Sequence, residues 1–451
     1  MSNVSSVAPL SLVADPGLPR QVLRQLSAIK VGPVPLPLFA AIAAVIFGAA
    51  YVGKLPADMI GGFAAIMMFG FLFSEIGARI PGLRTIGGSA ILCLFVSSAL
   101  VGYQAFYPEM GKVFVKSITG VMKDANFLYL YIACLVTGSM LGMNRRVLIQ
   151  GFLRMFVPLA IGTLGAVAAG IAAGLVFGYT PAHTFFFIVM PIIAGGIGEG
   201  TLPLSLAYSD ILSQPQAGLI ASLIPAALIG NVVAIVAAGV LKRVGEKHPD
   251  ACGNGLLVRT GDDNDLLKEI SQEKPIELPL MGAGLLMACT MFILGAFLAP
   301  FVGIPGPIIM ILGAAMLKVS KLIPARMELG AQQMYKFIAT NMTFPLLVGL
   351  GVLYVPWHDL VAAFTLPYFI ICTVTVLAMV SSGWFVGKLL NMYQVESAIV
   401  TACHSGLGGT GDVAILSACN RMGLMPFAQI STRIGGATMV VLAVFLLKIF
   451  H

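Results

Sequence analysis

The sequence predicts an all-α polytopic membrane protein, and three observations lead to this fold class. Of the 451 residues, 58% are hydrophobic and 10% are charged, whereas soluble domains are about half apolar and about a quarter charged. Apolar runs recur along the chain, and a spanning helix needs about 20 apolar residues. Two further apolar runs are interrupted by glycine-rich segments. A soluble protein with a large core is the alternative, and the low charge content argues against it.

The positive charge of the chain predicts its topology. The net charge is +7, and most Lys and Arg residues lie on alternate short loops between apolar runs, as is typical of cytoplasmic loops. This pattern places the N-terminus in the cytoplasm, and we expect the lipid bilayer as a partner and no nucleic acid. Seven cysteines occur without a CxxC spacing, so the sequence predicts neither a disulfide framework nor a zinc site.

Eleven apolar runs are predicted to be transmembrane helices. We expect residues 1–33 to form a cytoplasmic tail, residues 34–56 to hold an additional first span, and residues 242–275 to form a cytoplasmic connector. The predicted spans cover residues 36–52, 59–73, 86–106, 127–143, 156–179, 217–241, 278–299, 306–319, 337–355, 364–385 and 428–449.

Residues 184–212 and 395–420 are apolar, but their glycines and prolines prevent a continuous helix. The first stretch contains Pro191, Pro203 and the sequence GGIGEG between them. A glycine inside a helix costs about 1 kcal/mol and a proline about 3 kcal/mol. We predict that each stretch is a re-entrant hairpin with an unwound tip, which survives at membrane depth only where protein or water surrounds it.

The two hairpins occupy matching places in two halves of the chain. Residues 57–241 contain four spans, a hairpin and a fifth span, and residues 276–451 repeat this order in the opposite orientation. Such an inverted repeat with paired broken segments is typical of secondary transporters, whose substrate site lies at the breaks. The tips match in detail, because GGIGE at 195–199 corresponds to GGTGD at 408–412.

Glycines at the tips let the backbone approach a ligand closely. Half-helices that begin near a tip direct N–H groups and a positive dipole end at it, which suits a carboxylate. Gly196, Gly198 and Gly409 are therefore candidates for substrate binding. The alternative is that these glycines only allow close packing between helices.

Five polar residues near the tips are further candidates. Arg433 can hold a carboxylate by two parallel hydrogen bonds, or it can mark the cytoplasmic membrane surface. Asp412 and Glu199 can carry a proton or coordinate sodium, because carboxylates inside membranes are usually functional, or each can cap a half-helix. Thr410 offers a hydroxyl to substrate or cation, so a candidate sodium site lies near Thr410 and Asp412. His404 either titrates near neutrality or is a hydrogen-bonded structural residue.

Several motifs together are similar to those of one family. The chain resembles the bacterial 2-hydroxycarboxylate transporter family, which includes citrate and malate symporters and exchangers. The motifs are GGF at 61–63, DANF at 124–127, NRR at 144–146, the stretch 195–205, GGTGD at 408–412, LSACNRM at 416–422 and QISTRIGG at 429–436.

This resemblance implies eleven transmembrane helices with two re-entrant hairpins, in a homodimer of a bacterial inner membrane. It implies that a mobile helical domain carries citrate or malate past a dimerising scaffold, by an elevator-like movement with alternating access. The family's substrate arginine falls on Arg433, and its GGxG tips fall on 195–198 and 408–411, which adds Ile197 and Thr410 to the substrate site. No cofactor is implied beyond a coupling sodium ion or proton.

The tips differ from those of the family's sodium–citrate symporters in three positions. Gly406 and Leu407 stand where those symporters resemble Asn-Arg, and Ile197 stands where they resemble Asn. The missing arginine removes one partner for a substrate carboxylate, and the missing asparagines remove candidate ligands for a cation. Gly406 is therefore a position that bears on cation coupling. Sodium symport, proton symport and carboxylate exchange all stay open.

An intramembrane aspartyl protease is the alternative function, because GTGD at 409–412 reads as a GxGD motif. Such an enzyme needs a second aspartate that shares a proton with the first. The span predicted at 364–385 contains no aspartate. The sequence therefore predicts a transporter and not an enzyme.

Overall fold

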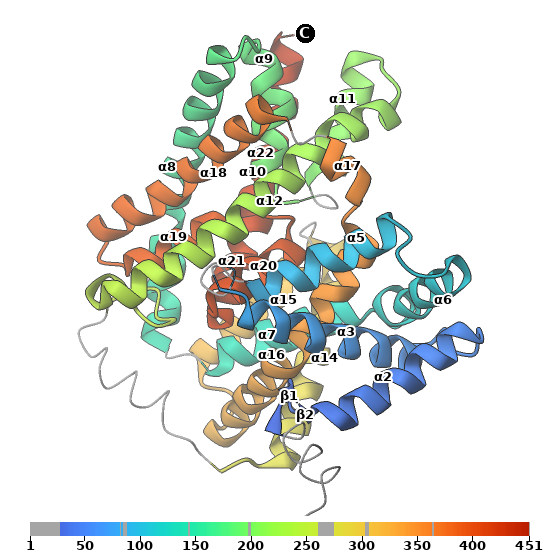
Figure 1. Ribbon diagram of the computed structural model, residues 1–451. Coiled ribbons are helices and arrows are strands. Elements are labelled where there is room, and N and C mark those ends of the chain that lie inside the picture. The colour runs from blue at the N-terminus through green and yellow to red at the C-terminus, as the bar shows by residue number, and fades with distance from the viewer. Residues whose placement is uncertain are drawn as a thin grey trace, which may run out of the picture.

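Nearly all of the structure is helical (Figure 1). The computed structural model describes residues 28–81, 83, 88–142, 145–196, 200–259, 275–302, 306–362 and 365–450. In this part of the chain, the strands β1 (Lys30–Val31) and β2 (Val34–Pro35) form one short antiparallel hairpin ahead of the first long helix.

Seven helices in the described ranges are long and apolar enough to cross a membrane, and a bent pair makes an eighth candidate span. The chain is thus an all-helical, multi-pass membrane protein. The seven are α3 (Met59–Arg79), α8 (Arg145–Val176), α12 (Gln216–Lys247), α14 (Leu278–Val302), α16 (Ala325–Tyr354), α18 (Leu366–Leu389) and a C-terminal helix that consists of η7 (Met422–Leu424), α21 (Met425–Ile430), η8 (Ser431–Gly435) and α22 (Gly436–Phe450).

The bent pair contains a helix that the sequence did not predict. Its first part is α6 (Pro108–Thr119) with the π-helical turn η3 (Gly120–Asp124), and its second part is α7 (Phe127–Gly142). The two parts meet at 47°. Only the second part was predicted as a span, because three lysines in the first part lower its hydrophobicity.

Other helices are shorter. Three of them coincide with predicted spans: α2 (Leu36–Tyr51), the run of α4 (Gly88–Ile91), η2 (Leu92–Val96) and α5 (Ser97–Gly102), and α15 (Gly306–Ser320). The remaining ones are α9 (Pro181–His183), η4 (Thr184–Val189), α10 (Met190–Ile193), α11 (Leu202–Leu212), η6 (Pro249–Ala251), α17 (Trp357–Ala362), α19 (Gln394–Cys403) and α20 (Gly409–Cys419).

The helices form two groups, which lie one above the other in Figure 1. In the lower group, α16 packs against α3, α7 and α14, and α14 also contacts α15. In the upper group, α18 packs against α8 and α19, and α12 packs against α10, α11 and α20. The groups touch where α20 meets α4 and α16, and where α21 meets α7.

Small residues let the helices of the lower group approach closely. A Cβ atom on Gly70 of α3 would lie 2.6 Å from the backbone nitrogen of Pro345 in α16. A Cβ atom on Gly351 of α16 would lie 2.1 Å from the carbonyl oxygen of Leu94. Neither position accepts a larger residue, as is usual where membrane helices pack through small side chains.

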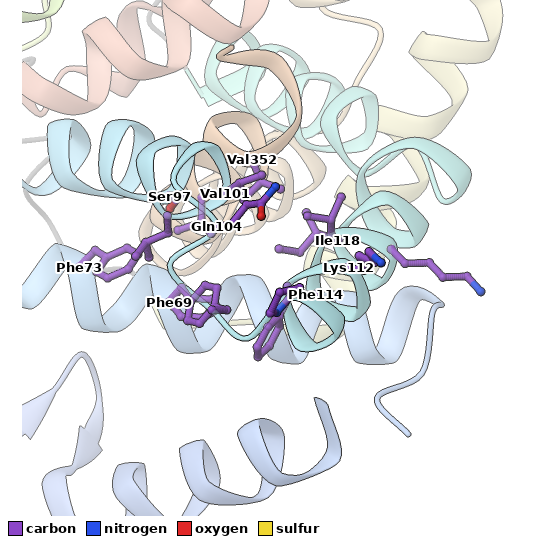
Figure 2. Close-up of a pocket in the computed structure, with 16 residues that line it drawn as sticks. Phe69, Phe73, Ser97, Val101, Gln104, Lys112, Phe114, Ile118 and Val352 are labelled. Carbon is purple, nitrogen blue, oxygen red and sulfur yellow. The ribbon is translucent and has the colours of Figure 1, made fainter. Parts of the chain in front are cut away.

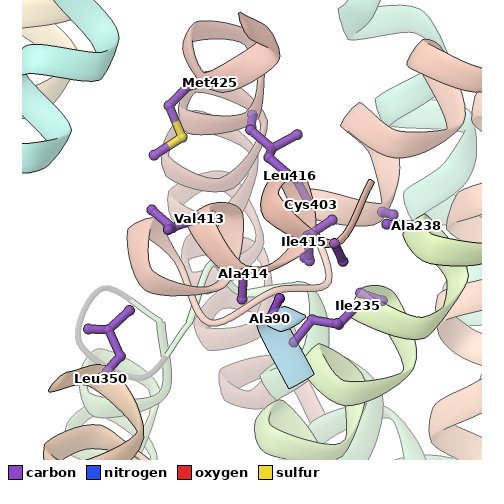
Figure 3. Packing of buried hydrophobic residues seen from close by; sticks show 14 of the residues in the cluster. Ala90, Ile235, Ala238, Leu350, Cys403, Val413, Ala414, Ile415, Leu416 and Met425 are labelled. Carbon is purple, nitrogen blue, oxygen red and sulfur yellow. The ribbon is translucent and has the colours of Figure 1, made fainter. Parts of the chain in front are cut away.

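Helix α20 is buried although it is only 11 residues long. Figure 3 shows its side chains among those of α4, α12 and α16. Val413, Ala414, Ile415 and Leu416 are at most 1% exposed. Residues on all sides of the helix are therefore covered by protein, which is the condition for broken helices at membrane depth.

The chain after α12 is anchored on the second broken helix. Val258 forms an antiparallel bridge with Met392, just before α19. The fully buried carboxylate of Glu396 accepts the Gly253 N–H at 2.7 Å and the Arg421 Nε–H at 3.2 Å. The predicted connector 242–275 therefore begins as the end of α12, and its residues 248–259, which we call the strap, then pack against the start of α19. Residues 260–274 lie outside the described part.

Candidate functional site

Two breaks in the helices carry glycines with positive φ. The first follows α10, where Gly195 and Gly196 have φ of +84° and +102°. The second precedes α20, where Gly408 has φ of +69° and stands at the N-cap. Residues other than glycine rarely adopt this region. The breaks lie where the sequence predicts the hairpin tips, and we call them the first and second tip.

The two tips touch through their backbones. A Cβ atom on Gly196 would lie 2.4 Å from the backbone nitrogen of Gly408 and 2.7 Å from the carbonyl oxygen of Leu407. A Cβ atom on Gly195 would lie 2.4 Å from the carbonyl oxygen of Thr432, in the C-terminal helix. Such contacts are open only to glycine, so three distant segments meet because glycines stand at these positions.

Arg433 lies beside the second tip. It belongs to η8, a π-helical turn, and such turns are frequent at functional sites. Arg433 is 6% exposed, and its Nε donates a hydrogen bond to Gln429 Oε1 at 2.8 Å. A Cβ atom on Gly409 would lie 3.5 Å from Arg433 Nη2. The guanidinium therefore faces the first turn of α20.

Asp412 is fully buried in the same place. Its Oδ2 accepts hydrogen bonds from Gln429 Nε2 at 2.7 Å and from Thr432 Oγ1 at 2.9 Å. These hydrogen bonds stabilise the Asp412 carboxylate, because a buried charge is tolerated only where it is paired and hydrogen-bonded. Asp412 and Arg433 are thus opposite charges that share Gln429 as a hydrogen-bond partner.

His404 and three hydroxyls lie buried around the tips. His404 Nδ1 is 2.9 Å from the carbonyl oxygen of Ser431, and a carbonyl only accepts, so Nδ1 carries the hydrogen. His404 Nε2 and the hydroxyls of Thr201, Ser405 and Ser431 have no hydrogen-bond partner within the described ranges. Buried polar atoms without protein partners usually bind water or an ion.

Asn231, in the middle of α12, is a site residue that the sequence did not single out. It is 1% exposed, and its Oδ1 accepts the Leu407 N–H at 3.2 Å. A Cβ atom on Gly411 would lie 2.6 Å from the same oxygen. The only available signal was a carboxamide in an otherwise apolar stretch, and such a residue on a continuous helix gives no hint of its distant partner.

The tertiary structure gathers most of the predicted site residues, and their roles as ligands stay predictions. For Thr410, only the backbone in α20 is described, and Ile197, Gly198 and Glu199 lie outside the described residues. The residues brought together at the tips are Gly196, His404, Gly406, Gly409, Asp412 and Arg433.

A cavity of about 390 Å³ lies elsewhere, between α3, α5, α6 and α16 (Figure 2). Phe69, Phe73 and Phe114 are among its mostly apolar lining residues, and none of the lining residues belongs to either tip or to η8. Lys112 at its edge is paired with Glu109 at 2.9 Å. This cavity does not present the buried cationic group that a carboxylate needs.

Broken helices that meet at a buried arginine and aspartate, within a many-spanning helical protein, are the architecture of a secondary transporter. The comparison with known families agrees. The chain belongs to the 2-hydroxycarboxylate transporter family, whose sequence pattern matches residues 31–445. It is therefore a transporter and not an intramembrane aspartyl protease.

Three relatives are similar over nearly the whole chain. The Na(+)-malate symporter of Bacillus subtilis (strain 168) is 55% identical over 431 residues, which are 96% of this chain and 95% of the relative. The citrate/malate-proton symporter of the same organism is 43% identical over 424 residues, 94% of this chain and 93% of the relative. The citrate/sodium symporter of Salmonella typhimurium (strain LT2) is 31% identical over 426 residues, 92% of this chain and 94% of the relative.

Proposed function

We propose that this protein is a cation-coupled symporter of malate, with citrate as a second substrate. The observation that carries the proposal is Arg433, a buried guanidinium at the meeting point of the two tips, linked through Gln429 to the carboxylate of Asp412. A site with one cationic and one anionic pole suits a carboxylate substrate and a coupling cation. The names of the relatives at 55% and 43% identity both include malate.

The substrate is proposed to bind by its carboxylates. Arg433 holds one of them, and the N–H groups in the first turn of α20, at Gly409 and Thr410, add donors and the positive end of the helix dipole. Gly196, Ile197 and Gly198 line the site from the first tip. Glycines at the tips keep side chains away, so the substrate reaches the backbone directly.

The coupling cation is proposed to bind on the aspartate side. Asp412 supplies the charge, and Thr410, Glu199, His404 and the backbone at Gly406 are the remaining candidates. Sodium is our first choice, since the relative at 55% identity is named a sodium symporter, and a proton is the second, since the relative at 43% is named a proton symporter. Carboxylate exchange is the third mode to be tested.

We further propose that the chain crosses the membrane eleven times. The seven long helices, the bent pair and the three shorter helices α2, α4–α5 and α15 together supply these crossings. The broken segments near 184–212 and 395–420 are then re-entrant hairpins within the inverted repeats 57–241 and 276–451. The tail, the additional span 34–56 and the connector 242–275 complete this division, with a cytoplasmic N-terminus in a bacterial inner membrane.

The two helix groups suggest how the site changes sides. Both tips, Asn231 and Arg433 belong to the upper group, so this group is proposed to move as the substrate carrier. The lower group, with α3, α7, α14 and α16, is proposed as the scaffold and as the homodimer contact. In this proposal the groups slide past each other at their interface, which includes the contacts of α20 with α4 and α16.

Uptake of radiolabelled malate into proteoliposomes tests this function. A sodium gradient, a proton gradient and internal unlabelled citrate are imposed one at a time, with protein-free liposomes as the blank. We expect the sodium gradient to stimulate uptake, and Asp412→Asn to lose that stimulation, because the amide keeps an acceptor but no charge.

The other outcomes discriminate between the alternatives. Stimulation by protons alone makes the protein a proton symporter, and stimulation by internal citrate alone makes it an exchanger. Failure of malate to enter in every arm contradicts malate as the substrate. An Asp412→Asn protein with normal sodium stimulation removes Asp412 from the cation site.

A further inference from the structure

Gln429 connects the two charged groups of the candidate site. It lies in α21, is fully buried, and stands one helical turn before Arg433. Its Nε2 donates to Asp412 Oδ2 at 2.7 Å, and its Oε1 accepts from Arg433 Nε at 2.8 Å. A single amide thus bridges a carboxylate from the second broken helix and a guanidinium from the C-terminal helix.

The chemistry of the two partners fixes the orientation of this amide. An ionised carboxylate only accepts hydrogen bonds, and a guanidinium only donates them. The NH₂ end of Gln429 must therefore face Asp412, and the oxygen must face Arg433. A flipped amide would lose both bonds, so the side chain has one orientation while both charges are in place.

We propose that Gln429 is the positioning residue that couples cation binding to substrate binding. The proposal rests on the proposed function, in which Asp412 serves the cation and Arg433 serves the substrate. A cation on Asp412 competes with the Gln429 NH₂ group for Oδ2 and shifts the amide. This shift weakens the hydrogen bond between Arg433 Nε and the amide oxygen, so that the guanidinium becomes available to the substrate.

Thermodynamic linkage makes this proposal measurable. If the cation tightens substrate binding by some factor, the substrate must tighten cation binding by the same factor. A residue that only supports the fold would change both affinities or the amount of folded protein, and would leave this factor unchanged. The factor is therefore the readout that separates coupling from structural support.

The experiment is calorimetric titration of malate into the purified full-length protein, with and without the coupling cation. Sodium at constant pH is the first probe, and a pH change without sodium is the second. Gln429→Met keeps the length of the side chain and removes both hydrogen bonds. Gln429→Glu keeps an acceptor for Arg433 and, when ionised, has no donor for Asp412.

Thr375→Val is the matched control. Thr375 is equally buried in α18, and its hydroxyl donates to the carbonyl of Ile371 in its own helix, at 2.8 Å. This control reports the effect of removing a buried polar group in the same helix group without touching either charge.

In the wild-type protein we expect the cation to tighten malate binding by about fivefold or more, the usual range of such coupling. In Gln429→Met and Gln429→Glu the factor should fall to within about twofold of unity, and Thr375→Val should keep the wild-type factor. Gln429→Glu should also bind malate more weakly without cation, because its charge competes for Arg433.

Two results would overturn the proposal. One is a folded Gln429→Met protein that keeps the wild-type factor, and the other is a variant that binds no malate under any condition, which would make Gln429 a direct ligand. If one variant does not elute as folded protein, the other decides. Absence of malate binding by the wild-type protein contradicts the proposed function itself and is recognised before any variant is compared.

Discussion

The first and second tips are built from the same glycine pattern, yet different kinds of atoms surround them. The glycines of the first tip face backbone: Gly195 faces the carbonyl of Thr432, and Gly196 faces the chain at Gly408. At the second tip, Gly408 likewise faces the carbonyl of Gly195, but Gly409 faces the side chains of Ile132, Gln429 and Arg433. Among the described residues, the first tip contributes shape and close backbone approach, and the buried charges of Asp412 and Arg433 lie beside the second tip.

The largest expected effect tests the charged side of this comparison. Arg433→Ala removes the guanidinium, and a hydrogen bond to a charged group is worth about 1.5–3 kcal/mol. Loss of two such bonds to a carboxylate should weaken malate binding by about a hundredfold or more. Uptake into proteoliposomes should be abolished, and Arg433→Lys should recover only part of it, since lysine lacks the planar fork.

Elution as folded protein is the control for both arginine variants. If the folded Arg433→Ala protein takes up malate at the wild-type rate, Arg433 is no ligand. The contrast between the tips would then lose its chemical meaning.

A second prediction tests the shape of the first tip. Gly196→Ala requires an alanine at φ of +102°, with its Cβ 2.4 Å from the backbone nitrogen of Gly408. The strain costs about 1–3 kcal/mol before the clash is counted. Uptake should fall by about tenfold or more. Gly165→Ala in α8 is the matched control, because among the described residues its added Cβ meets nothing within 4 Å beyond its own stretch of helix.

The readout for this pair is the initial rate of malate uptake per folded protein. A Gly196→Ala protein as active as Gly165→Ala would show that the two tips need not touch during transport.

The smallest expected effect comes from Asn231→Ala. This change removes the acceptor for the Leu407 N–H, and a neutral hydrogen bond contributes about 0.5–1.5 kcal/mol. We expect malate affinity to fall by about fivefold, with little change in the maximal rate. Saturation curves for uptake separate the affinity from the maximal rate. An unchanged affinity would mean that the hydrogen bond from Leu407 to Asn231 does not shape the second tip for binding.

Part of the site could be read from local residues. Gly196, Gly408 and Gly409 were found because glycines that interrupt apolar runs are costly in a helix and therefore signal a break. Arg433 and Asp412 were found because charges within such runs are rare. The neutral residues that hold these groups were not found. Gln429 lies within the motif at 429–436 but carries no charge that points to Asp412, and Asn231 accepts the N–H of Leu407 from a distant part of the chain.

The strap after α12 shows the same limit. The sequence predicts 242–275 only as a cytoplasmic connector and assigns no role to Glu396. The structure joins them, with Glu396 accepting the N–H groups of Gly253 and Gly255 at 2.7 and 3.1 Å. The two segments lie more than 130 residues apart in the chain, and such a pairing is invisible to any short window of sequence.

The sequence by itself determined the membrane class, the places where helices break and the charged residues beside the breaks. These follow from hydrophobicity, helix propensity and the cost of buried charge, which depend on residue type and near neighbours. Only the tertiary structure decided that the two tips touch, that Gln429 bridges Asp412 and Arg433, and that Asn231 holds the second tip. Those facts depend on how distant helices pack, and close packing is decided by the shapes of all the surfaces together.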